Sequence, residues 1–336
     1  MVPGLCGPAS EAPFSAFPGE QPLALEKLLA RARVKSGLAR DLDATVGDYF
    51  GLSAGEAGTL PVAPLTWLAD TGTPGAGYLM RVDPVHLRAD QSSLRLYDSH
   101  AFSIDPGEAQ ELAAAFNDLY RDRGWQLEAV APTRWYLALA DPPVLETRSP
   151  ADCAGRDINE LLPCGADSRE WHALLNEVQM LFHTHPVNTA RERRGEPAIN
   201  SIWPWGGGVL PAKVETSLAS VIGDQPLVMG LAQLAGIPRR DLPAEAVELA
   251  AELGDGTHLV VIDALAAAAQ YADTGAWAAG LLQLESAWFR PLLEMLGDGR
   301  VGQLDLCPVN GRRYRVSRRL LQRFWIRPRR LAQHCR

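Results

Sequence analysis

The chain has 336 residues, of which 47% are hydrophobic and 21% are charged, and its formal net charge is −8. This composition supports a buried core in one large domain or two ordinary ones, so it excludes an intrinsically disordered chain. The negative charge argues against a dedicated nucleic-acid-binding protein, because such proteins need a basic surface to displace counterions from phosphates.

The sequence contains no sign of a membrane or secretory segment. Residues 1–8 lack a basic stretch followed by an apolar run, and the most apolar stretch, Leu259 to Ala269, is too short to cross a bilayer. We therefore expect a cytoplasmic protein with no membrane partner. The five cysteines are odd in number and form no CxxC pair, which fits structural thiols in a reducing compartment, with a zinc site as the alternative.

The first half of the chain predicts one helix and then a compact lobe. Leucines at helical spacing indicate a helix near 22–33. Asp105-Pro106-Gly107-Glu108 is typical of a helix start, with a capping acid, an early proline and a glutamate three residues after the cap. Strands are predicted at 78–82, 93–97, 126–130 and 134–139, with a turn at 89–92. This order of strand, strand, helix, strand and strand predicts an α+β lobe.

The second half predicts strands that alternate with helices. Helices are expected at 168–183, 225–235, 244–253 and 276–296, and strands at 201–205, 257–263 and 301–306. The strand around Leu259 to Ile262 is apolar on both faces, so we expect it at the centre of a mostly parallel sheet that is covered by helices on both sides.

The last residues are strongly basic. From Gly311 onward there are ten arginines and no acid, and subtracting these ten charges from −8 leaves −18 on the residues before them. A tail that is solvated or docked on its own protein is the favoured interpretation. An acidic protein partner or RNA is the alternative.

The segment from His185 to Gly208 carries the strongest candidate chemistry. Its arginines lie near His185, Asn188 and Asn200, and guanidinium groups match phosphate or carboxylate oxygens two at a time, which makes an anion site a hypothesis. Three successive glycines from Gly206 allow a close approach of the backbone to a ligand or to another strand. The competing interpretation is a Trp-rich strand end, a glycine turn and a solvated arginine helix.

This segment resembles the archaeal-type cofactor-independent phosphoglycerate mutases. The matching residues are His185-Pro186-Val187-Asn188, Arg191, Arg194-Gly195, Ala198 and Asn200-Ser201-Ile202-Trp203-Pro204-Trp205-Gly206-Gly207-Gly208, and the strand Tyr78 to Pro84 also resembles a strand of that family. The resemblance covers roughly 75–310. It implies an α/β fold with an alkaline phosphatase-like core whose mostly parallel sheet is flanked by helices, plus an inserted smaller α+β lobe. The implied boundaries are 1–75 for an N-terminal helical segment that joins the core, 76–186 for the lobe, 187–310 for the core and 311–336 for the basic tail.

The sequence departs from the family where its enzymes bind metals. Ala266 and Gln270 stand where the resemblance places an Asp and a His ligand, and only Asp305 remains of a later Asp-His pair. No N-terminal metal segment and no Ser or Thr nucleophile match in 1–76. Hard cations need several oxygen or imidazole ligands, so the resemblance predicts no catalytic residue, no bound metal and no cofactor.

This altered pattern, with the stretch Arg323 to Pro328, is similar to bacterial RpfE-type regulatory proteins. The resemblance then implies an anion cleft without catalysis, which would bind a phosphorylated or carboxylated small molecule. Its predicted residues are Arg81, His185, Asn188, Arg191, Arg194, Asn200, Trp203, Trp205 and Gly206. The second hypothesis is an active phosphoglycerate mutase or related phosphotransferase whose ligands lie at other positions.

Other chemistries have weaker support in the sequence. His183 and His185 are two residues apart, which is poor spacing for a metal pair on a helix. A GxxxxGKS/T motif is absent from the sequence. Asp263 and Asp305 lie at the ends of predicted strands. An aspartate at a strand end caps the next helix more often than it acts as an acid or base.

Overall fold

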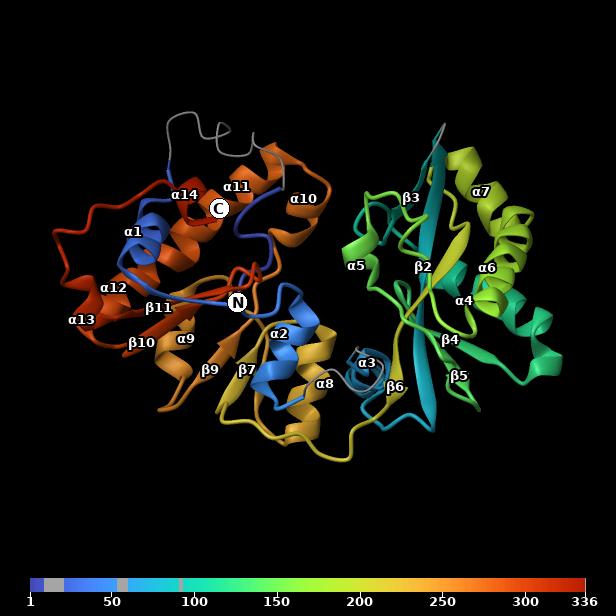
Figure 1. Cartoon of the computed structure of the whole chain (residues 1–336), viewed down its shortest axis with the longest axis horizontal. Helices are drawn as coiled ribbons and strands as arrows, with labels where there is room; N and C mark the ends of the chain where they lie inside the picture. The colour runs from blue at the N-terminus through green and yellow to red at the C-terminus, as the bar shows by residue number, and fades with distance from the viewer. Residues whose placement is uncertain (9–20, 53–59, 91–92, 336) are drawn as a thin grey trace. The chain divides into compact units, whose positions relative to one another are not determined.

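The computed structural model describes residues 1–8, 21–52, 60–90 and 93–335, and the chain forms two compact units (Figure 1). Unit 1 consists of Met1–Tyr49, Ser217–Gln225 and Ile237–Arg336, and unit 2 of Phe50–Thr216 and Pro226–Gly236. The lobe predicted at 76–186 thus lies within unit 2, which also includes residues on both sides of it.

Unit 2 is built on a five-stranded antiparallel sheet around one long strand, β2. The strands are β2 (Tyr78–Asp90), β3 (Ser93–Tyr97), β4 (Gln126–Ala131), β5 (Arg134–Leu139) and β6 (Ser201–Val209). They follow the order β3-β2-β5-β4, and β6 also pairs with β2. The sequence correctly predicts the first four strands. The turn expected at 89–92 does not begin at residue 89, since β2 continues to Asp90. Residues 91–92 lie outside the described part.

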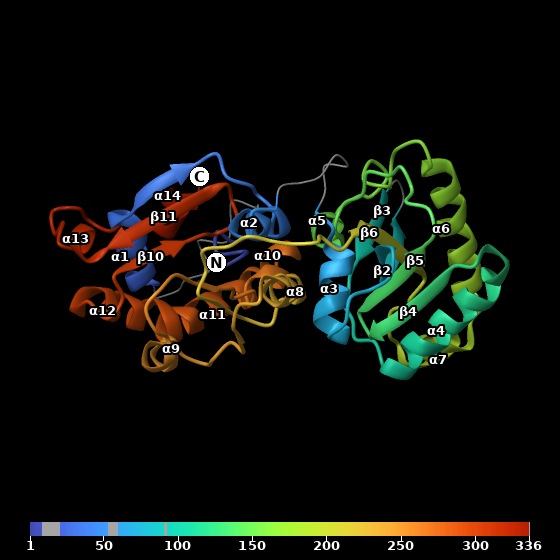
Figure 2. The ribbon, with the colours of Figure 1, turned by 90° about the horizontal axis from the view of Figure 1, so that it is seen from below.

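Helices cover the two faces of this sheet, as Figure 2 shows. One face carries α4 (Pro106–Leu119), α6 (Ser168–His183) and α7 (Pro186–Arg194), and the other carries α3 (Val62–Thr71), which packs on α8 (Pro226–Ala235). Strand side chains point alternately to opposite faces. Met80 and Val82 of β2 therefore pack in the main core with the first set of helices, while Leu79 packs with Ala63 on the α3 side. The short elements η2 (Arg121–Arg123) and α5 (Pro150–Cys153) complete unit 2.

Two close backbone approaches hold α3 in place. A Cβ atom on Gly206 of β6 would lie 2.9 Å from the Val62 side chain, and Gly206 has a φ of +60°, which favours glycine. A Cβ atom on Gly230 of α8 would lie 1.9 Å from the carbonyl oxygen of Leu65. Glycine at these positions lets α3 pack directly against a strand and a helix.

Unit 1 contains two three-stranded sheets. The parallel sheet has the order β8-β7-β9, formed by β7 (Ser220–Ile222), β8 (Arg239–Arg240) and β9 (His258–Val260). The antiparallel sheet has the order β1-β11-β10, formed by β1 (Arg33–Ser36), β10 (Gln303–Leu306) and β11 (Arg312–Ser317). The first residues of the chain lie along β9, because the Met1 amino group donates to the Val260 oxygen and Ile262 N–H donates to the Met1 oxygen.

The helices of unit 1 enclose its apolar core. They are α1 (Leu23–Arg31), α2 (Leu42–Tyr49), α9 (Ala246–Glu252), α10 (Ala266–Gln270), α11 (Thr274–Leu284), the π-helical turn η3 (Glu285–Phe289), α12 (Arg290–Asp298), α13 (Arg318–Leu321) and α14 (Leu331–Cys335). Helix α1 begins after Pro22, whose side chain supplies no cap. The buried Glu285 carboxylate accepts from the Ala24 and Leu25 N–H groups instead, which satisfies two free donors of that helix.

Several expectations need correction. The α/β class holds as helices with mixed sheets, but most strand pairs are antiparallel, so a mostly parallel core sheet was a wrong expectation. The segment from Ser201 onward joins the sheet of unit 2 through β2, because an apolar strand reveals nothing of which strand it will pair with. Among the strands of the described residues, β9 pairs with β7 alone, so the expected central place of β9 was also wrong. The first residues of the chain lie on its other side.

The basic tail is part of the fold of unit 1. Its strand β11 lies in the middle of the antiparallel sheet, and Tyr314 and Val316 are buried in the core. A disulfide joins Cys6 to Cys335, while Cys153, Cys164 and Cys307 are free thiols, so the expectation of thiols alone was wrong for that pair. Cys6 and Cys335 are 329 residues apart in the sequence, so the local spacing of cysteines could not reveal this disulfide. No helix in the described residues is long and apolar enough to span a membrane.

Candidate functional site

The predicted segment begins at the junction of α6 and α7 in unit 2. His185 caps α7, and its Nδ1 accepts a hydrogen bond from Val187 N–H at 3.3 Å. Pro186 occupies the first helical position, where a missing N–H has no cost. His185 therefore has a local structural role at a helix start.

The side-chain amides of Asn188 and Asn200 form hydrogen bonds with backbone groups of the protein. The Asn188 amide nitrogen donates to the oxygens of Phe182 and Ile199, both at 2.8 Å, and its oxygen accepts from Ile199 N–H. The Asn200 amide bonds in the same way to both the N–H and the oxygen of Leu87 on β2. The two asparagines thus connect the segment to neighbouring elements.

Arg191 is buried, with 1% of its side chain exposed. Its Nε donates to the Pro197 oxygen at 2.7 Å, Nη2 donates to the Ser103 oxygen at 2.9 Å, and Nη1 pairs with the Glu108 carboxylate. A buried charge is stable only when it is paired and hydrogen-bonded, and these partners supply both. Arg191 connects α7 to the start of α4.

Arg194 lies at the surface of α7, with 47% of its side chain exposed. Its guanidinium pairs with Glu108 at 2.6 Å and with Glu196 at 2.7 Å. The hydrogen bond from Arg194 lowers the pKa of the Glu196 carboxyl below its usual value. Its partners are therefore two side-chain acids of the same unit.

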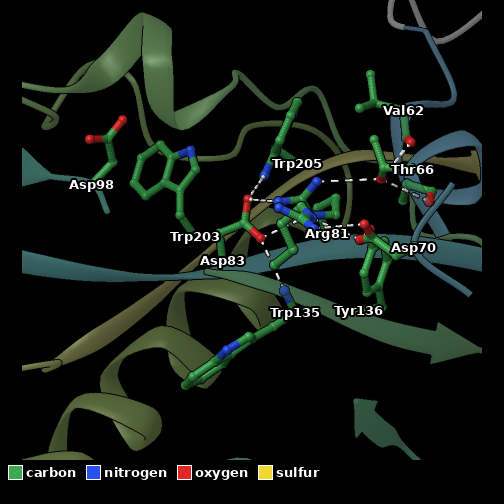
Figure 3. A network of polar contacts seen from close by, with 12 residues as sticks. Val62, Thr66, Asp70, Arg81, Asp83, Asp98, Trp135, Tyr136, Trp203 and Trp205 are labelled. Atoms are coloured by element: carbon green, nitrogen blue, oxygen red, sulfur yellow. Dashed lines mark hydrogen bonds and ion pairs between the residues drawn. The ribbon is translucent and has the colours of Figure 1, made fainter. Parts of the chain in front are cut away.

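A second network surrounds Arg81 and Asp83 on the α3 face of the sheet (Figure 3). Arg81 Nε and Nη2 donate to the two Asp83 carboxylate oxygens at 2.8 and 2.7 Å, and Nη1 donates to Thr66 of α3 at 3.3 Å. Asp83 also accepts from the Trp205 indole N–H at 2.7 Å and from Trp135 N–H at 3.2 Å. Both side chains are less than one tenth exposed, so all of this occurs away from water.

Aromatic rings and another ion pair enclose this network. The Arg81 guanidinium carbon lies 5.2 Å from the ring centroids of both Tyr136 and Trp205, which is within cation–π range. The Tyr136 hydroxyl donates to Asp70, which also pairs with Arg134 at 2.7 Å. Burial raises the pKa of Asp83, and the bonds from Arg81, Trp205 and Trp135 offset part of that rise.

The remaining predicted residues lie on β6. Trp203 is 1% exposed, and its indole N–H donates to the Arg148 oxygen at 2.8 Å. Trp205 belongs to the Arg81 network, and Gly206 lies against α3 at Val62. The close approach at Gly206 is thus an approach to a helix, whereas Gly207 lies against side chains of the neighbouring strand β2.

Four residues of the predicted set belong to side-chain networks, and these networks form two groups that share no residue. Arg81 and Trp205 belong to one group, and Arg191 and Arg194 belong to the other. Whether any of these side chains also binds an anion stays a prediction. The sequence analysis missed Asp83, Thr66, Asp70 and Tyr136. The spacing of Arg81 and Asp83 was an available signal, because residues two apart on a strand share a face and opposite charges there pair.

The positions implied for metals lie in unit 1 and are occupied differently. Ala266 and Gln270 are the first and last residues of α10. Asp263 accepts a hydrogen bond from Gln225 at 2.6 Å, and Asp305 pairs with Arg315 at 2.8 Å. In the part of the chain that the structure describes, no three His, Cys, Asp or Glu side chains gather as a metal site would require.

Comparison with known proteins finds partial similarity to phosphoglycerate mutases. No protein-family profile matches the chain. A stretch of 97 residues is 31% identical to the 2,3-bisphosphoglycerate-independent phosphoglycerate mutase of Methanosarcina barkeri (strain Fusaro / DSM 804), covering 27% of this chain and 24% of the relative. A protein of the same name from Methanosarcina acetivorans is 30% identical over 104 residues, covering 29% and 26%. The chain thus spans about a quarter of the length of the curated relatives it matches.

Two solved structures have remote similarity to most of the chain. The cofactor-independent phosphoglycerate mutase from Thermoplasma acidophilum has a TM-score of 0.41 and 16% identity, covering 92% of this chain and 87% of that chain. The PH0037 protein from Pyrococcus horikoshii has a TM-score of 0.45 and 13% identity, covering 90% and 77%. The link to phosphoglycerate mutases therefore rests on the partial sequence match.

Proposed function

We propose that this phosphoglycerate mutase-like chain has lost metal-dependent phosphoryl transfer and acts as a regulatory protein that binds a ligand, as the similarity to RpfE-type proteins implies. The observation that carries the proposal is the set of residues at the implied metal positions. Ala266 offers no donor atom, Gln270 offers only an amide, and Asp263 and Asp305 already have partners within unit 1. Two hard cations need several oxygen or imidazole ligands that converge.

The organisation of the mutase-like segment also supports the proposal. Arg191 and both asparagines use their polar groups on internal partners, so the residues that resemble the family serve the packing of unit 2. Evolution can retain such residues for stability after catalysis is gone, since removing one partner of a buried ion pair is costly. A ligand anion at Arg194, whose side chain is half exposed, would have to compete with Glu108 and Glu196 for the guanidinium.

A turnover assay tests the loss of catalysis. We expect no conversion of 3-phosphoglycerate to 2-phosphoglycerate above the buffer blank when Mn²⁺ is supplied, because the described residues contain no cluster of metal ligands that would activate a hydroxyl or neutralise the transferred phosphoryl group. A phosphoglycerate mutase of established activity, assayed in parallel, confirms that the conditions support the reaction. A rate that disappears with chelator would show instead that the chain is an active mutase with ligands at other positions.

A further inference from the structure

A basic groove of about 820 Å³ lies on unit 1 along the antiparallel sheet. Its lining includes Arg33 of β1, Arg315 of β11, Arg319 of α13, and Arg323 and Trp325 just after that helix. Arg33 pairs in register with Arg315 on the neighbouring strand, so the sheet fixes one wall. The volume is that of a site for a small ligand.

Most of the positive charge in this groove is not neutralised within the protein. Arg315 pairs with Asp305 at 2.8 Å. Among the described residues, the guanidinium groups of Arg33, Arg319 and Arg323 have no ion pair, and no acid lines the groove. Arg194 and Arg191 of unit 2, by contrast, each pair with Glu108. Three guanidinium groups without a carboxylate favour an anionic ligand, above all phosphate.

An exposed aromatic pair accompanies these arginines. Trp325 is 68% exposed and Phe324 is 82% exposed, and their ring centroids lie 5.3 Å apart at 80°. Other tryptophans of the chain, such as Trp203 and Trp277, are almost completely buried. An indole face left open beside guanidinium groups can stack on a planar ring, which a phosphorylated sugar or a phosphoglycerate does not have.

We infer that this groove binds a nucleoside phosphate, with the base stacked on Trp325 and the phosphate held by Arg319, Arg323 and Arg33. A small ligand fits better than a nucleic-acid strand, because the net charge of −8 repels a long polyanion more than one phosphate group. The inference deepens the proposed regulatory role, because it names the class of ligand. It rests on the proposed function in one respect, namely that the chain binds a ligand.

Calorimetry with adenosine 5′-monophosphate tests the inference, in chelator and at one fixed ionic strength. We expect saturable binding that Arg323→Ala and Trp325→Ala each weaken about tenfold, because each removes a charge-assisted hydrogen bond or a stacked ring. Arg290→Ala is the matched control, since Arg290 is exposed on α12 and does not line the groove. Circular dichroism of each variant verifies folding.

Other probes define the results that would overturn it. Ribose 5-phosphate binding as tightly as the nucleotide, with Trp325→Ala without effect, would mean that no planar ring is recognised. Much tighter binding of a single-stranded oligonucleotide, or competition by polyglutamate, would identify a nucleic acid or an acidic protein partner instead. No binding of any probe would also refute the inference. All of these results are independent of the turnover assay. That assay alone would show whether the chain has kept its catalytic activity.

Discussion

Replacing Asp83 with alanine is expected to lower the free energy of unfolding by ~3–5 kcal/mol, because it leaves the buried Arg81 guanidinium without a counter-charge. Asp83 accepts two hydrogen bonds from Arg81 and one each from Trp205 and Trp135. The same change therefore leaves several buried donors unsatisfied. Denaturant unfolding followed by tryptophan fluorescence measures the loss.

Two further variants interpret that measurement. Asp141→Ala removes an exposed aspartate from the same unit and should change the free energy of unfolding by less than ~0.5 kcal/mol. The double variant Arg81→Met with Asp83→Leu should recover part of the loss, since removing both charges leaves no unpaired ion. An Asp83→Ala protein as stable as the parent would contradict the buried network.

Replacing Arg191 with alanine is expected to cost a similar ~3–5 kcal/mol of unfolding free energy. The change leaves Glu108, which is 14% exposed, with one cationic partner, and it removes hydrogen bonds to two backbone oxygens. Arg194→Ala should cost much less, because a half-exposed ion pair is screened by water.

Arg193→Ala is the matched control for this pair, since Arg193 is exposed on the same helix. Thermal and denaturant unfolding of the three variants ranks them. Equal, small effects of Arg191→Ala and Arg194→Ala would mean that Arg191 is not held as the structure places it. The Arg191 side chain would then be free for an anion, as the sequence first suggested.

Local patterns in the sequence predicted much of unit 2. The capping residues at Asp105 place the start of α4, and the apolar spacing from Ser168 to His183 gives the whole of α6. Both signals depend on neighbours within a few residues, where helical periodicity and caps operate. The same locality explains the success with the first four strands of the sheet.

Long-range pairing could not be predicted in this way. Strand β6 lies against β2, more than one hundred residues earlier, and no local pattern distinguishes that partner from a parallel neighbour in a core sheet. The sequence of the basic tail did contain evidence of a strand, because Tyr314 and Val316 alternate with arginines as in a half-buried strand. The high positive charge drew the interpretation toward a solvated tail.

The candidate site was predicted by residue type but not by environment. Arginine, asparagine and tryptophan are residues that bind anions and also residues that stabilise buried turns, and the sequence does not distinguish these roles. The structure assigns internal partners to Arg81, Asn188, Arg191 and Asn200. The groove at Trp325 could not be predicted, because it requires β1, β11 and α13 to lie together.

Calorimetric titration of the chelator-treated, dialysed protein with Mn²⁺ tests the loss of the metal site most directly. We expect no saturable heat at concentrations where a two-metal enzyme would be fully loaded, because Ala266 and Gln270 provide no carboxylate or imidazole and the nearby aspartates are engaged. Saturable binding of two Mn²⁺ ions per chain would contradict the account and restore a metal-dependent phosphotransferase.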